Sequence, residues 1–137
     1  MRRVAFGAMA LLLLGTAASK AEDGLVTVEL NKLQDEGTAC QAFMLLQNTT
    51  PLSFEALALD LVMFDREGII SRRLAVEMAP LRAGKTTVKV FSMDGLECTG
   101  IGRILLNDVV TCTADTEAPD CLGLITTASR ADAEFVK

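Results

Sequence analysis

Seven short apolar segments, each bounded by turn-forming residues, occupy the chain from Leu25 onward. They are Leu25–Leu33, Cys40–Gln47, Phe54–Phe64, Ile69–Met78, Thr86–Met93, Arg103–Thr111 and Leu122–Ser129. Clusters of Gly, Pro, Asn, Asp and Glu separate them, at intervals of about 8–12 residues. Such spacing is typical of an all-β sandwich, so we expect one antiparallel domain of about seven strands over residues 22–130.

The third segment has the clearest alternation. One face of it carries a row of large apolar residues, Leu57, Leu59, Leu61 and Met63. In a strand this row lies in the core and Asp60 lies outside. A helix over Phe54–Phe64 is the alternative, since several of its residues favour helices. The turn Asp65–Gly68 favours a strand, because Gly68 supplies the positive φ of a tight hairpin.

The sixth segment is apolar on both faces. One face carries Ile104, Leu106 and Val110, and the other carries Arg103, Leu105, Asn107 and Val109. We therefore expect a central strand here. In the fourth segment Arg72 shares a face with apolar residues, so we expect it near a sheet end, with its stem on apolar surface and its head in water.

The first 21 residues resemble a secretory signal peptide in composition. Arg2 and Arg3 precede an uncharged apolar run, Val4–Ala18, and Ser19-Lys20-Ala21 provides a small-x-small cleavage site. A membrane anchor is the alternative, but the run is shorter than the roughly 20 residues that span a bilayer. We expect cleavage after Ala21, a periplasmic location and no stable membrane anchor after cleavage.

Two export routes remain open. General secretion is favoured, because any signal peptide needs a basic start and cysteines that oxidise after export fit this route. The twin-arginine route is the alternative, although Arg2 directly follows Met1 and Phe6 lies three places after Arg3.

Cleavage makes the chain strongly acidic. Lysines and arginines fall from 13 to 10 while all 18 acids remain, so the net charge changes from −5 to −8. Phosphate backbones and anionic lipids repel such a protein, and we expect no nucleic-acid partner. The last residues, 131–137, are polar enough to predict a flexible tail.

Four cysteines, an even number in an exported chain, predict two disulfides. Their spacings exclude a Cys-x-x-Cys redox or metal site, and the chain has no histidine. In an immunoglobulin-like arrangement the second and fifth strands are antiparallel neighbours. From the three connectivities we therefore choose Cys40–Cys98, and Cys112–Cys121 across one loop.

Two stretches carry a family resemblance. Leu61-Val62-Met63-Phe64-Asp65 with Glu67-Gly68, and the turn Pro80–Lys85, resemble the FxLYD type of small exported immunoglobulin-like domain, with Leu61, Met63 and Phe64 departing from that signature. The whole chain also resembles a group of small secreted proteins of alphaproteobacteria labelled only by a twin-arginine signal. These resemblances imply an immunoglobulin-like fold and a periplasmic location, and they imply no activity.

Composition excludes much catalytic chemistry. Without histidine, tyrosine or tryptophan the chain lacks the commonest general base, the serine and cysteine triads, and the usual aromatic platforms for ligands. The 18 acids are scattered mostly at turns, so no carboxylate pair is singled out as a glycosidase site. We therefore predict no enzyme, no catalytic residue and no cofactor.

Two local patterns have a functional and a structural interpretation. Asp115, Glu117 and Asp120 could bind calcium weakly, but their spacing is not that of an EF-hand and a solvated acidic loop is favoured. Asn48-Thr49-Thr50 matches a glycosylation acceptor, but a turn is favoured. We accordingly assign no metal site.

Export, small size and missing catalytic groups together favour a role in protein contacts. Phe43 and Leu45 lie opposite in parity to the core residues of the second segment, and with the apolar sixth segment they indicate either an interface or a covered core. We predict an accessory or assembly component of an envelope system, with an envelope protein as partner. A small-ligand or calcium-binding periplasmic protein is the alternative.

Overall fold

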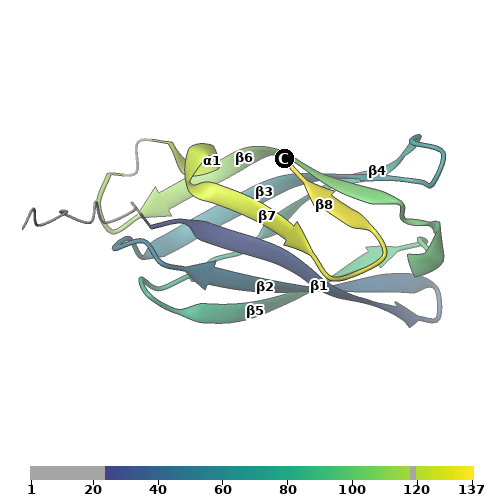
Figure 1. Cartoon of the computed structure of the whole chain (residues 1–137), viewed down its shortest axis with the longest axis horizontal. Helices are drawn as coiled ribbons and strands as arrows, with labels where there is room; N and C mark the ends of the chain where they lie inside the picture. The colour runs from purple at the N-terminus through teal and green to yellow at the C-terminus, as the bar shows by residue number, and fades with distance from the viewer. Residues whose placement is uncertain (1–23, 118–119) are drawn as a thin grey trace, which may run out of the picture.

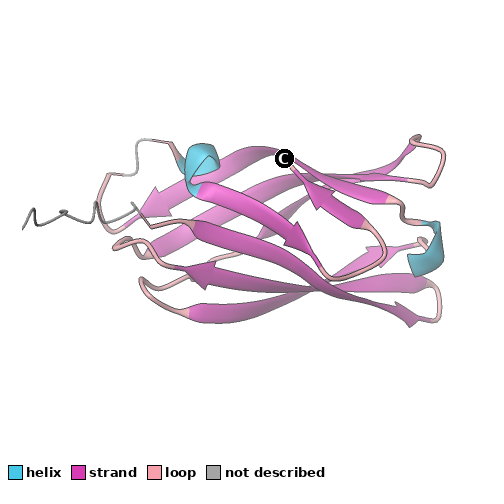
Figure 2. Cartoon of the chain, viewed as in Figure 1, coloured by secondary structure: helices cyan, strands magenta, loops and turns pink. Residues whose placement is uncertain are grey.

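The structure is a computed structural model that describes residues 24–117 and 120–137. It consists of two four-stranded sheets packed face to face, as expected of an all-β sandwich (Figure 1, Figure 2). The strands are β1 (Val26–Glu36), β2 (Ala39–Asn48), β3 (Phe54–Phe64), β4 (Ile70–Glu77), β5 (Thr86–Asp94), β6 (Arg103–Ala114), β7 (Ile125–Ser129) and β8 (Glu134–Val136). Short helical turns, η1 (Cys98–Gly100) and α1 (Cys121–Leu124), flank β6.

One sheet has the strand order β5-β2-β1-β7 and the other β4-β3-β6-β8. The first six strands pair antiparallel as expected, but both sheets are mixed, because β7 runs parallel to β1 and β8 runs parallel to β6. As expected, β2 and β5 are antiparallel neighbours, and β6 lies inside its sheet between β3 and β8.

The core lies between the sheets and follows the alternation of the strands. The predicted row on β3 is fully buried, with Leu57, Leu59, Leu61 and Met63 at most 1% exposed. Facing residues come from the other sheet, chiefly Val26, Val28, Leu30, Met44 and Leu46.

The predicted β3–β4 hairpin is also confirmed. Gly68 has a φ of 82°, and Asp65 accepts from the backbone N–H groups of Glu67 and Ile69.

The alternation predicted for β6 fails in its second half. Its pairing with β3 slips beside Asp60 and again beside Leu59, so one extra residue enters β6 at Asn107 and another at Val110. Each β-bulge reverses which face the following side chains occupy. Val109 therefore packs against the core, whereas Val110, which the alternation placed on the same face as Ile104 and Leu106, is 60% exposed.

The predicted flexible tail over 131–137 is wrong. Glu134–Val136 form β8 at the edge beside β6, and Phe135 is only 4% exposed. The Lys137 ammonium donates to the carbonyls of Leu122 and Ile125, which ties the end of the chain to β7. The gain from burying one phenylalanine between the sheets outweighs the polar composition of this segment.

Both predicted disulfides are present. Cys40 on β2 bonds Cys98 at the start of η1, and Cys112 on β6 bonds Cys121 at the start of α1. The Cα atoms of the two pairs are 5.0 and 6.5 Å apart, within the usual range for disulfides. In the described residues no cysteine is free.

Asn48, the residue of the possible glycosylation acceptor, has a structural role. It is 1% exposed, and its amide donates to the carbonyls of Leu52 and Arg82. Its Oδ1 accepts from the backbone N–H and the hydroxyl of Thr50. A buried amide that uses both N–H groups in this way holds a turn, as the favoured interpretation predicted.

The expected signal peptide over residues 1–21, with its cleavage after Ala21, lies outside the described residues. Within residues 24–117 and 120–137, no helix is long and apolar enough to cross a bilayer.

Candidate functional site

The most distinctive surface is the outer face of the β5-β2-β1-β7 sheet. Cross-strand partners set two adjacent rows on this face: Leu45 beside Val88, and Phe43 beside Val90. Val88 is 58% exposed and Val90 is 47% exposed. We call these four residues the apolar face. On β2 and β5 a row of uncharged polar residues lies on each side of the apolar face. One row is Gln47 beside Thr86, and the other is Gln41 beside Ser92.

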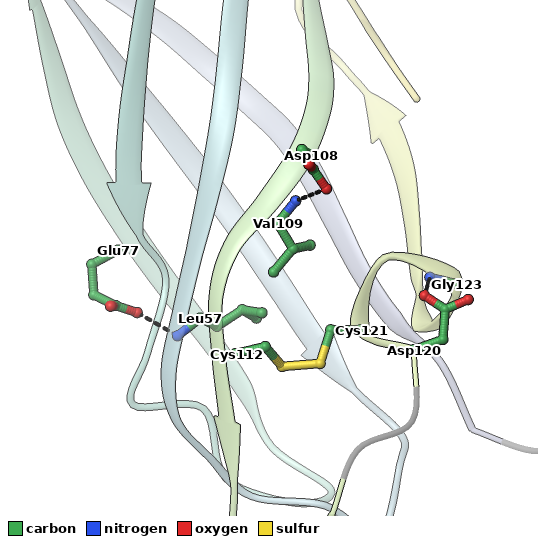
Figure 3. The surroundings of a disulfide bond; sticks show 8 residues. All are labelled: Leu57, Glu77, Asp108, Val109, Cys112, Asp120, Cys121 and Gly123. Atoms are coloured by element: carbon green, nitrogen blue, oxygen red, sulfur yellow. Dashed lines mark hydrogen bonds between the residues drawn. A yellow bond between two sulfur atoms is a disulfide. The ribbon is translucent and has the colours of Figure 1, made fainter.

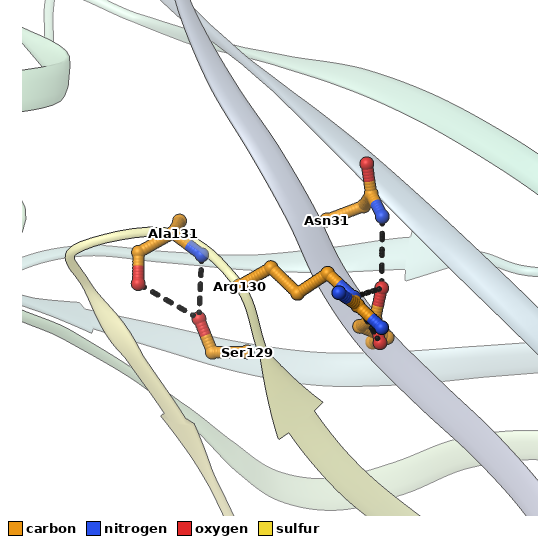
Figure 4. Close-up of polar contacts among 5 residues, drawn as sticks. Asn31, Ser129, Arg130 and Ala131 are labelled. Atoms are coloured by element: carbon orange, nitrogen blue, oxygen red, sulfur yellow. Dashed lines mark hydrogen bonds and ion pairs between the residues drawn. The ribbon is translucent and has the colours of Figure 1, made fainter.

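The charges near the apolar face come from β1. Lys32 pairs with Phe43 across the strands, and its ammonium lies 4.5 Å from the centre of the Phe43 ring. Glu29 pairs with Leu45. Its carboxylate accepts from Arg130 at 3.2 Å and from Asn31 at 2.8 Å. Figure 4 shows these two donors, with the Arg130 side chain reaching toward β1. These hydrogen bonds lower the pKa of the Glu29 carboxyl, and the bond from Asn31 has the largest effect.

A β-bulge between Leu30 and Lys32 places Asn31 beside this face. It borders a shallow groove of about 280 Å³ lined by Asn31, Lys32, Phe43, Met44, Leu45 and Val88. The face therefore offers projecting valines and an adjoining apolar hollow. Faces with few charges, aromatic and aliphatic centres and a polar rim are typical of protein interfaces.

Cationic side chains close the edge of the sandwich beside this face. Lys89 on β5 points to the inner side, and its ammonium donates to the Ala79 carbonyl at 2.9 Å. Arg72 on β4 is half-buried and donates to the Asp94 carbonyl, as expected of a residue near a sheet end with its stem on apolar surface. Inward-pointing charges on edge strands discourage the addition of further strands. The outer face, rather than the edge, is thus the open surface.

The opposite sheet carries a buried carboxylate on its outer face. We expected Asp60 to be outside, and it does lie on the outer face, but it is only 5% exposed. Arg73 on β4 binds both its oxygens at 2.8 Å, and Asn107, the extra residue of the β6 bulge, donates at 2.7 Å. The hydrogen bond from Arg73 and then that from Asn107 lower the pKa of the Asp60 carboxyl. Both carboxylate oxygens of Asp60 have hydrogen-bond partners, so this cluster links β3, β4 and β6 and has a structural role.

Two of the acids that we considered for calcium make separate local contacts, and Figure 3 shows one of them, Asp120. Asp120 accepts from the Gly123 N–H and caps α1, beside the Cys112–Cys121 disulfide. Asp115 accepts from the Ser53 N–H. Among the described residues no three acidic, cysteine or histidine side chains are grouped to hold a metal ion.

A second groove, of about 380 Å³, lies at the end of the sandwich that carries η1. Two of its charged groups already have partners: Arg66 donates to the Thr99 carbonyl, and Asp35 accepts from the Cys98 N–H. It offers a ligand mixed charges with no concentration of one sign.

Sequence reasoning found half of the apolar face. Phe43 and Leu45 lie outside the core as their parity predicted. The expected contribution from β6 is absent, because the bulges move Val109 inward and leave Val110 isolated on the other sheet. Val88 and Val90 were missed, although the alternation of Val88, Lys89 and Val90 was a signal that the middle of one side of β5 is aliphatic.

Comparison with known proteins adds information on the fold. No family model matches the sequence, and no curated protein sequence is similar to it. A solved structure of IrmA from Escherichia coli superimposes with a TM-score of 0.54 at 14% sequence identity, over 77% of this chain and 92% of that chain. At this identity the likeness is one of fold, and it supports the assignment of an all-β sandwich.

Proposed function

We propose that this chain is an exported, periplasmic protein that acts through protein contacts as an accessory or assembly component of an envelope system. The observation that carries the proposal is the apolar face, where Val88 and Val90 are about half exposed beside Phe43 and Leu45. Leaving such a surface in water is costly, so a partner that covers it gains free energy from burial.

The two disulfides support the export part of the proposal, because disulfides persist in oxidising compartments. The missing histidine, tyrosine and tryptophan support a role in binding rather than catalysis. We expect the protein recovered after export to begin at Glu22 and to carry four fewer hydrogens than its reduced form, which intact mass spectrometry measures. A mass that retains residues 1–21 would contradict the cleavage.

Site-specific photo-crosslinking in cells tests the contact surface. A photoreactive amino acid at Val88 should give a discrete crosslinked species, because the side chain lies on the surface that we propose a partner covers. Val110 is the matched control, since it is also an exposed valine but lies on β6 of the other sheet. Equal crosslinking from positions 88 and 110, or none from position 88, would overturn the proposal.

A further inference from the structure

The outer face of the β5-β2-β1-β7 sheet has a nearly palindromic order of rows. Along the strands, a polar row is followed by two apolar rows and then by another polar row. From one end the rows are Thr27-Gln47-Thr86, Glu29-Leu45-Val88, Lys32-Phe43-Val90 and Gln34-Gln41-Ser92. A surface that has the same order in both directions is suited to a partner with the same surface.

We propose that the apolar face binds a second copy of this chain, sheet against sheet, around a two-fold axis that runs between its two central rows. This inference rests on the proposed function and names its partner. The axis sets Val88 of each copy against Val90 of the other, and Leu45 against Phe43. The polar rows then face each other as well. Such a contact is isologous, as in most homodimers, and sheets pack in this way in sandwiches.

The charges of the face favour this occupant. The same axis sets Lys32 of one copy against Glu29 of the other, so the base and the acid of the central rows face each other, with Glu29 also bound to Arg130 of its own copy. Elsewhere the chain carries an excess of acids and has a net charge of −5. Two copies would repel each other if their acidic surfaces met, whereas the four rows of this face contain no other charged residue.

The size of the face sets the expected strength of the dimer. The three strands that carry all four rows lie about 4.8 Å apart and the rows about 6.8 Å apart, so the face covers roughly 400 Å² per copy, or roughly 800 Å² in total. This total is below the roughly 1,000 Å² of a stable specific interface, so the dimer is a weak one. We therefore expect a dimer that dissociates in the micromolar range.

Sedimentation equilibrium over a wide range of protein concentrations tests the inference. Interference optics are needed, since the chain has neither tryptophan nor tyrosine. The exported protein should show a monomer–dimer equilibrium. Val88→Lys should raise the dissociation constant by at least about 100-fold, because each dimer then buries the unpaired ammonium twice. Val110→Lys should leave the equilibrium unchanged, and circular dichroism melting curves should show that both variants remain folded.

Cysteine pairing tests the position of the axis. Val88→Cys and Val90→Cys variants, mixed under mild oxidation, should form the mixed 88–90 disulfide faster than either variant forms a disulfide with itself. Peptide mapping distinguishes these products from any that involve the four native cysteines. A mixture in which the two homodisulfides form faster than the mixed one would overturn the axis that we propose.

A monomer at all concentrations up to several hundred micromolar would overturn the second copy as partner. In that case crosslinking from Val88 to a different protein would leave the proposed function standing. Monomeric behaviour together with no crosslink from Val88 would overturn both.

Discussion

Replacing Cys40 and Cys98 together by alanine is expected to lower the free energy of unfolding by about 4 kcal/mol. The bond joins residues 58 apart, and closing a loop of that length removes much of the entropy of the unfolded chain. It also anchors η1 to β2, where Cys40 is fully buried in the core. Urea denaturation followed by far-UV circular dichroism measures the change, since the chain lacks the usual fluorescent residues.

The second disulfide provides the matched comparison. Cys112 and Cys121 are only 9 residues apart, so their joint replacement by alanine is expected to cost about 2.5 kcal/mol. If disulfides stabilise by limiting the entropy of the unfolded chain, losing Cys40–Cys98 must lower the free energy of unfolding more than losing Cys112–Cys121. This order would be contradicted if loss of Cys112–Cys121 destabilised the protein as much as loss of Cys40–Cys98.

The sequence was sufficient to predict the strands in which side chains alternate without interruption. β3 carries four large apolar residues at period two, and all four are buried as expected. The disulfide pairing also followed, because it required only that the second and fifth strands be neighbours. Both predictions depend on local periodicity and chain order, which a single sequence contains.

The bulges of β6 could not be predicted in the same way. Asn107 and Val110 are extra residues relative to β3, and their effect appears only when the two strands are paired. A period-two pattern assigns Val110 to the core, whereas the paired strands place Val109 there. The bulge at Asn107 also supplies one of the three hydrogen bonds to Asp60. The buried carboxylate therefore depends on tertiary pairing.

The last strand and the β5 half of the apolar face were missed for a related reason. β8 has three residues, too few for a periodic signal, and it is held by a free edge of β6. On β5, Lys89 rather than Val88 or Val90 points to the inner side. Hydrophobicity alone does not decide the orientation, because Phe91 and Met93 share the inner side with Lys89. Lys89 donates to the carbonyl of Ala79, which follows β4 of the other sheet. This hydrogen bond makes the observed orientation favourable.

Arg73→Ala is expected to destabilise the fold at pH 7 far more than loss of an ordinary surface arginine. Asp60 has only 7% of its side chain exposed, and it would lose two of its three hydrogen-bond donations. Leaving a buried carboxylate without its cation costs several kcal/mol in general, and the 67% exposure of the Arg73 side chain reduces that figure through solvent screening. Chemical denaturation of both proteins at pH 7 measures the difference.

The effect of Arg73→Ala should depend on pH. In the native protein Arg73 and Asn107 lower the pKa of Asp60, so this carboxylate stabilises the fold above the unfolded value of about 3.9. That stabilisation is lost as the pH falls through the lower, folded pKa. In the variant the buried carboxyl lacks its cation, and its pKa is higher than in the native protein. The difference in stability between the two proteins should therefore shrink as the pH falls below about 4.

Two further variants separate the ion pair from general effects of removing an arginine. Arg82→Ala, at an exposed position, should change the stability little at either pH. In an Asp60→Asn background, Arg73→Ala should cost much less than in the native protein and should lose its pH dependence, because no carboxylate is left without a partner. An equal cost of Arg73→Ala in both backgrounds would mean that the aliphatic stem of Arg73, packed on the sheet, carries the stabilisation instead of its charge.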